Sequence, residues 1–212
     1  MGRKSIAILL VALLLIISTA ILAFAVFSFP PDSVTNSEDS QTVMKGLAFI
    51  ENVLPIDTTQ YNITLEKPVP SMNLNETYEE RYSLQCEKST LMATCHYQNN
   101  TLQFCFISVR NGSVILKNSY NNTIDAALGF LIRYQNYTNI DSTELTTMLQ
   151  NIDSLEDKVL TSGNLSLTIK SGEFPQGTKT TSFSWRYVLN DCEYTGLSLG
   201  FDNGTFAGFS DT

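Results

Sequence analysis

The chain has 212 residues, a formal net charge of −8 at pH 7 and a pI near 4.6. It carries no basic stripe that could replace the counterions of a nucleic acid, so the composition excludes a nucleic-acid-binding protein. Charged residues make up only 16 % of the chain, and we expect Asn, Ser and Thr to provide much of the surface instead.

Residues 6–29 form an uncharged apolar run, IAILLVALLLIISTAILAFAVFSF, directly after Arg3 and Lys4. A helix rises about 1.5 Å per residue, so Ile6–Phe29 can cross a hydrocarbon core of roughly 30 Å. Ala23-Phe24-Ala25 offers a cleavage site, but the apolar core exceeds the ~7–15 residues of a cleaved signal. We therefore predict an uncleaved signal-anchor in residues 1–29, with a cleaved signal as the alternative.

The basic residues before this run and the acidic residues after it place the N-terminus in the cytoplasm. The chain is then a single-pass protein of the cell membrane, contacting the bilayer through Ile6–Phe29, and its C-terminal part lies outside the cytoplasm. Residues 30–40, PPDSVTNSEDS, read as a polar linker.

Asn-x-Ser/Thr sequons recur through the rest of the chain more often than chance predicts, which favours an exported glycoprotein. The alternative is that Asn-Gly-Ser and Asn-Asn-Thr are only turn sequences. The glycosylation candidates are Asn62, Asn75, Asn99, Asn111, Asn121, Asn136, Asn164 and Asn203.

Four cysteines, Cys86, Cys95, Cys105 and Cys192, are disulfide candidates, because an even count outside the cell suggests two bridges. Three pairings are possible. A turn near Thr90 would bring Cys86 close to Cys95, whereas a three-residue turn at Asn99–Thr101 would set Cys95 opposite Cys105. Buried free thiols are the alternative.

Residues 41–117 predict one helix followed by an antiparallel sheet. Apolar residues at helical spacing mark the helix, and Pro55 ends it. We expect Lys67-Pro68-Val69-Pro70 to break the first strand. Alternating apolar residues place the strands at Tyr61–Leu65, Tyr82–Gln85, Leu91–Tyr97 and Leu102–Val109.

Two asparagine pairs predict turns in this half. Asn99-Asn100 suits a tight hairpin, because Asn tolerates positive φ. That turn would put Phe104 and Phe106 on the same sheet face as Cys95. Asn111-Gly112 predicts a second turn, into a strand at Val114–Leu116.

Residues 118–212 predict two helices and a second antiparallel sheet. Asn122 or Thr123 can cap the first helix, and Asp141 with Glu144 forms a capping box for the second. Alternation then predicts strands at Leu165–Ile169 and Phe183–Leu189. Phe183, Trp185, Tyr187 and Leu189 are expected to face the core together.

The last strands require a β-bulge. A turn at Asn190-Asp191 sets Tyr187 opposite Tyr194, which gives Leu197, Leu199 and Phe201 the wrong parity for the core. One extra residue at Gly196 corrects this parity. Asp202-Asn203-Gly204 predicts the final hairpin turn.

The two halves share the order helix, strand and hairpin strands, and Leu47–Ile50 echoes Leu128–Leu131. The ending Gly200-Phe201-Asp202-Asn203-Gly204-Thr205 resembles that of PepSY-like domains, which implies an extracytoplasmic α+β module, possibly in tandem. The predicted fold class is α+β: an N-terminal transmembrane helix, then antiparallel meander sheets each covered by helix, in two related halves (41–117 and 118–212).

No constellation predicts catalysis, and no cofactor or metal site is predicted. His96 stands beside Cys95, but neighbours on a strand point to opposite faces. Glu76, Glu79 and Glu80 read as a solvated acidic run. We expect a tethered extracytoplasmic binding or regulatory module that meets an envelope protein or ligand. A structural, pilus-like subunit is the alternative, and an envelope hydrolase is less favoured.

Overall fold

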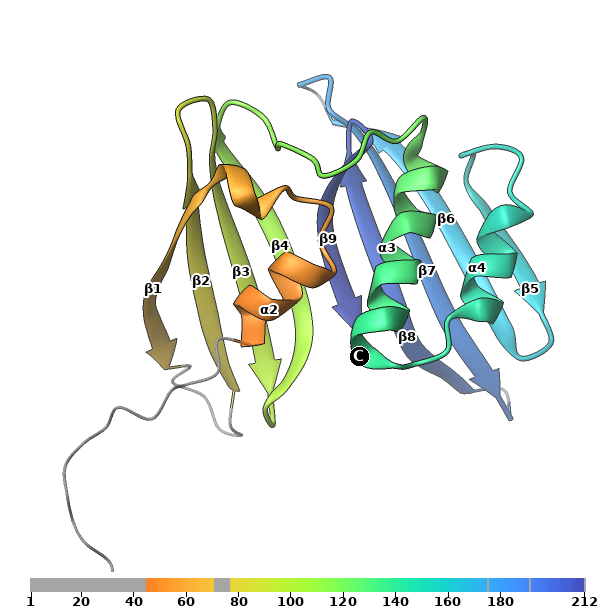
Figure 1. Ribbon diagram of the computed structural model, residues 1–212. Coiled ribbons are helices and arrows are strands. Elements are labelled where there is room, and N and C mark those ends of the chain that lie inside the picture. The colour runs from red at the N-terminus through yellow and green to blue at the C-terminus, as the bar shows by residue number, and fades with distance from the viewer. Residues whose placement is uncertain (1–44, 71–76, 175, 191, 212) are drawn as a thin grey trace, which may run out of the picture. The chain divides into compact units, whose positions relative to one another are not determined.

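Nine antiparallel strands form one sheet in the computed structural model, which describes residues 45–70, 77–174, 176–190 and 192–211 (Figure 1). Ile6–Phe29 lies outside these residues. Across the sheet the order is β1-β2-β3-β4-β9-β8-β7-β6-β5. The strands are β1 (Asn62–Pro70), β2 (Thr77–Gln85), β3 (Thr90–Gln98), β4 (Thr101–Asn111), β5 (Lys158–Ser162), β6 (Leu165–Glu173), β7 (Lys179–Leu189), β8 (Cys192–Asp202) and β9 (Thr205–Asp211).

The predicted fold class is wrong. The structure is mostly antiparallel β, with 51 % strand and 23 % helix. Its α-helices are short: α2 (Lys45–Asn52), α3 (Thr123–Thr138) and α4 (Thr143–Gln150), beside the 3₁₀ turn η1 (Thr58–Gln60). No helix within the described ranges is both long and apolar enough to cross a bilayer.

The two expected sheets are a single sheet because β4 pairs with β9. Phe104, Cys105 and Phe106 pair with Ser210, Phe209 and Gly208, respectively. Each meander would otherwise end in an exposed edge strand with unpaired N–H and C=O groups. Pairing the two edges satisfies these groups, and residues Met44–Thr212 form one compact unit.

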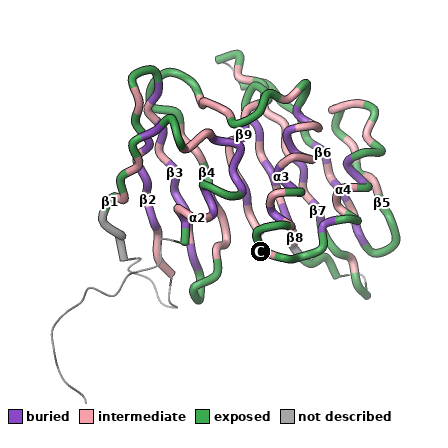
Figure 2. Tube along the Cα trace, viewed as in Figure 1, coloured by how far each residue is buried: buried purple, intermediate pink, exposed green. Residues whose placement is uncertain are grey.

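The three α-helices among the described residues cover the same face of the sheet (Figures 1 and 2). Aromatic side chains fill the space where the two halves meet under these helices. The ring of Phe49 on α2 lies 5.1 Å from that of Phe209 on β9, and Phe130 on α3 stacks 5.3 Å from Phe206. This cluster ties both helices to the central strand.

The Asn99-Asn100 hairpin turn is confirmed, because both residues have positive φ and Gln98 pairs with Thr101. The prediction that Phe104 and Phe106 share a sheet face with Cys95 is wrong. The register shifts between His96 and Tyr97, so Gln103 is an extra residue on β4. Phe104 and Phe106 therefore point away from the helices, on the face opposite to Cys95.

Two other strand predictions also fail. The backbone of β1 continues through Pro68 and Pro70, which is tolerated because β1 is an edge strand. After the Gly112 turn, Val114–Leu116 forms no strand, and only an isolated bridge joins Leu116 to Ile56.

The bulge at Gly196 is confirmed. The β7–β8 register shifts between Ser184 and Arg186, and Trp185, Leu197 and Leu199 are all buried. The core prediction for the rest of β7 is wrong, since Tyr187 is 46 % and Leu189 51 % exposed. Both lie near the end of the β7–β8 hairpin.

The helix starts agree partly with the sequence. Asn122 caps α3, accepting a 2.8 Å hydrogen bond from the Asp125 amide. At α4 no capping box with Glu144 is formed. Instead, Asp141 accepts a 2.9 Å bond from the Thr143 amide, so the first turn is held by an Asx-type contact.

Candidate binding surfaces

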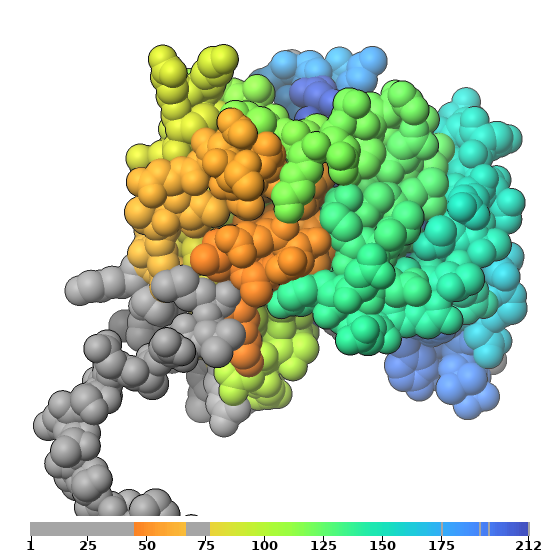
Figure 3. Space-filling view, in the orientation of Figure 1, coloured from red at the N-terminus to blue at the C-terminus, as the bar shows by residue number. Residues whose placement is uncertain are grey.

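A cavity of about 320 Å³ opens at the end of the sheet that carries the β3–β4 turn. We call it the end cavity. Its walls come from α2, α3, the end of β3, the start of β4 and the end of β9. Figure 3 shows α2 and α3 side by side on the helix-covered side of the molecule. Apolar side chains dominate the lining, among them Phe49, Leu102, Tyr137, Ile140 and Phe209.

The end cavity also holds one cationic and one anionic side chain. The Lys45 ammonium donates to the Asn100 carbonyl over 3.3 Å. The Tyr134 hydroxyl donates to the Asp211 carboxylate. Burial and this carboxylate raise the pKa of Tyr134 above its usual value, so Tyr134 is a neutral donor at physiological pH.

The second surface is the sheet face opposite the helices, here called the open face. None of the described helices lies on it. Cross-strand register places its side chains in rows, because residues paired across a ladder share a face. One row runs from Ser184 through Ser198, Ser210 and Phe104 to His96.

Large aromatic groups gather on the β3–β4 part of the open face. The His96 and Phe104 rings stack with centroids 4.5 Å apart, and Phe106 follows Phe104 at 6.2 Å. Phe106 is 43 % exposed. We call His96, Phe104 and Phe106 the aromatic ridge.

The middle of the β7, β8 and β9 part of the open face carries only hydroxymethyl groups and hydrogens, and on β7 it is flanked by Thr180 and the exposed Arg186. The half-buried residues of this middle part form the small-residue trough. The Ser198 hydroxyl donates to that of Ser184 over 3.0 Å. The trough consists of Ser182, Ser184, Ser198, Gly200, Gly208 and Ser210.

The structure separates the predicted acidic run. Glu76 lies outside the described residues. Glu79 is on the open face, where it pairs with Arg81 at 2.8 Å, and its carboxylate lies 3.6 Å from Nδ1 of His96. Glu80 points to the other face and is only 4 % exposed, so these carboxylates do not form one site.

The buried Glu80 carboxylate organises the start of α2, a role that the sequence did not indicate. Its Oε2 accepts hydrogen bonds from the Gly46 amide at 2.8 Å and from the hydroxyls of Tyr82 at 2.7 Å and Tyr97 at 3.3 Å. The pKa of both tyrosine hydroxyls is raised, mainly because they are buried. Glu80 thus serves packing and capping rather than acid–base chemistry.

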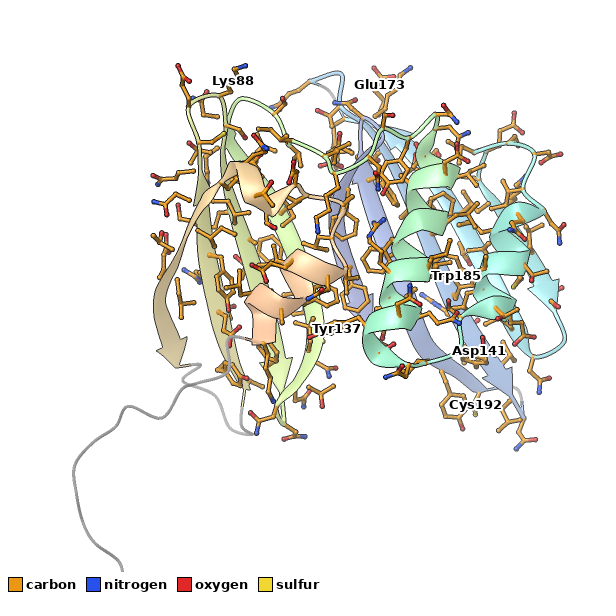
Figure 4. All side chains as sticks on the ribbon, in the orientation of Figure 1. Lys88, Tyr137, Asp141, Glu173, Trp185 and Cys192 are labelled. Atoms are coloured by element: carbon orange, nitrogen blue, oxygen red, sulfur yellow. The ribbon has the colours of Figure 1, made fainter. Side chains whose placement is uncertain are left out.

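Cys95 and Cys105 face each other across β3 and β4, with sulfurs 3.1 Å apart. All four cysteines are free thiols here. Cys192 begins β8 directly after the β7–β8 turn, at the opposite end of the sheet from Lys88 and hence from nearby Cys86 (Figure 4). Pairing of Cys95 with Cys105 therefore stays a prediction, and one that the geometry favours over Cys86 with Cys95.

Every described sequon asparagine is exposed, whereas Asn75 lies outside the described residues. They occupy turns, strand ends, the edge strand and α3, so none stands among the ridge and trough. The exposed candidates are Asn62, Asn99, Asn111, Asn121, Asn136, Asn164 and Asn203. Their glycosylation stays a prediction.

No protein-family model, curated protein or solved structure matches the chain. The resemblance to PepSY-like domains therefore stays a prediction. Within the described ranges, no three His, Cys, Asp or Glu side chains are grouped as metal ligands would be.

Proposed function

We propose that this chain is a membrane-tethered, extracytoplasmic binding module without catalysis, and that the end cavity holds its ligand. The end cavity carries this proposal, because its apolar lining also contains two charged side chains, those of Lys45 and Asp211. Its volume of about 320 Å³ falls at the small end of the range for ligand pockets. The apolar run Ile6–Phe29 and the exposed sequons support the location.

The lining favours a small amphipathic molecule. An apolar body can contact Phe49, Leu102 and Phe209, which makes burial favourable in proportion to the area removed from water. A polar end can reach the Lys45 ammonium, which is exposed and bonded only weakly to a carbonyl at 3.3 Å. An anionic or strongly accepting head group suits this position best.

Extraction and mass spectrometry of the purified full chain test this proposal. Small molecules that co-purify with the wild type are compared with those from Ile140→Trp, which fills the rim of the end cavity. Ile132→Trp is the matched control, because Ile132 is exposed on α3 and does not line the cavity. A species lost only with Ile140→Trp is expected, and identical extracts from all three proteins would contradict the proposal.

Membrane extraction tests the tether separately. The chain should stay in the membrane after high-salt and carbonate washes, because the apolar span is uncleaved. A mature N-terminus at Val26 in the soluble fraction would contradict the tether. An N-terminus created just before the apolar run would instead favour the pilus-like subunit.

A further inference from the structure

We propose that two copies of this chain pack through their open faces, with the aromatic ridge of each copy over the small-residue trough of the other. The inference rests on the proposed membrane tether only for the direction of the two-fold axis. It does not depend on the ligand of the end cavity.

The first argument comes from two glycines that the fold itself does not require. Gly200 and Gly208 pair with each other in the middle of β8 and β9, and neither has positive φ. A Cβ on Gly200 would meet nothing closer than the Gly208 backbone at 3.9 Å, and one on Gly208 nothing closer than 3.6 Å. Glycine weakens a strand interior, and it often marks close approach of another backbone. Apart from the neighbouring strands β4, β8 and β9, no described segment lies within 4 Å of these positions, and an outside partner would explain the glycines.

The second argument is self-complementarity. The ridge lies on β3 and β4, and the trough on β9, β8 and β7, immediately beside it in the sheet. A two-fold axis parallel to β9 therefore sets β4 of one copy over β8 of the other, and β3 over β7. Each ridge then enters the partner's trough, which is the isologous contact that closes a dimer. An axis perpendicular to the strands would set ridge against ridge.

The tether selects the same axis. Lys45, at the start of α2, lies at the β3–β4 turn end, where it contacts Asn100. Rotation about an axis along the strands keeps this end of both copies on the same side. Two chains anchored in one membrane can therefore form this dimer without turning either copy over.

The available area is sufficient. The seven central strands, about 4.8 Å apart, and three side-chain rows about 6.7 Å apart span roughly 700 Å² per copy. Twice this area falls within the roughly 1,200–2,000 Å² buried by stable specific interfaces. The sequon asparagines stand outside the ridge and trough, so glycans on them would leave this contact free.

Thiol cross-linking of the full chain in membranes tests the dimer. Ser210 lies on β9 beside the proposed axis, so the two copies of Ser210→Cys should face each other. Face-to-face sheets lie about 10 Å apart, beyond disulfide reach, so a short bismaleimide is the probe. Cys86→Ser and Cys192→Ser remove the native thiols that are partly or fully exposed. Ile132→Cys, on the helix side, is the matched control.

The expected result is a species of doubled mass with Ser210→Cys and none with Ile132→Cys. Adding Gly200→Tyr should reduce the cross-linked fraction about tenfold or more, as at an interface hot spot. A Cβ at position 200 meets nothing closer than 3.9 Å, so the folded monomer has room for the tyrosine. Fluorescence of Trp185 checks that the variant is folded. Cross-linking at Ile132→Cys only, a product with another protein, or a yield unchanged by Gly200→Tyr would each overturn the dimer. A dimer with an empty end cavity would reject only the proposed ligand.

Discussion

Replacing Glu80 with Ala should be among the most destabilising single changes in the N-terminal half of the sheet. The carboxylate is buried and receives three hydrogen bonds, from the Gly46 amide and from Tyr82 and Tyr97. The space is tight as well, because a Cβ on Gly46 would lie 2.5 Å from Oε2 of Glu80. The same oxygen therefore positions α2 against β2 and β3.

The expected magnitude follows from the groups left behind. Each buried donor without an acceptor costs about 1–3 kcal/mol, although removing a buried charge recovers part of this loss. We expect Glu80→Ala to lower the free energy of unfolding by about 3–5 kcal/mol. Glu80→Gln keeps an acceptor oxygen and should cost about 1–2 kcal/mol, the difference between charged and neutral hydrogen bonds. Glu79→Ala, next in sequence but partly exposed, should cost under ~1 kcal/mol.

Urea unfolding of the detergent-solubilised full chain measures these values, followed by far-UV circular dichroism and by fluorescence of Trp185. Trp185 is the single tryptophan and lies in the other half of the sheet. Both probes should report the same shift, because one sheet contains both halves. If Glu80→Ala lowers the free energy of unfolding by less than ~1 kcal/mol, the argument that buried donors are left without an acceptor is refuted. A loss confined to one probe would show that the halves unfold separately.

Two further predictions concern β8 and the thiol pair. Gly196→Ala would place a Cβ 2.9 Å from the Trp185 carbonyl oxygen, so it should cost about 1–3 kcal/mol of unfolding free energy, whereas Gly172→Ala meets its nearest atom at 3.5 Å and should be near neutral. Equal effects of the two alanines in urea unfolding would contradict the bulge geometry. In the exported protein Cys95 and Cys105 should form a disulfide, seen as a linked peptide after non-reducing digestion, and their full alkylation in unfolded, unreduced protein would argue against it.

The tight turns were predictable because their residues have local reasons to adopt them. Asn99, Asn100, Asn190, Asn203 and Gly204 all have positive φ, as their residue types suggest. The bulge at Gly196 was also predictable, because Leu197, Leu199 and Phe201 could face the core only if one extra residue preceded them. Long-range pairing of β4 with β9 was not predictable, because it links edges that are distant in sequence and leaves no local pattern.

Neither the end cavity nor the role of Glu80 could be inferred from sequence. The end cavity gathers residues from five helices and strands that only the joined sheet brings together. Glu80 stood in a run of acidic residues, which reads as solvated surface. The one indication of its burial was strand alternation, because Glu80 lies on the same face of β2 as Tyr82 and Leu84, which are both buried.

The failed prediction for β4 has a physical reason that bears on the open face. Phe104 and Phe106 alternate with Cys105 and Ile107, so apolar residues occupy both parities of the strand. Alternation cannot then decide which set faces the helices, and the extra residue Gln103 leaves the two phenylalanines outside. A strand that is apolar on both faces is typical of sheets that are covered on both sides. The helices cover one side of β4, and a second copy of the open face, with its trough of serines and glycines, would cover the other.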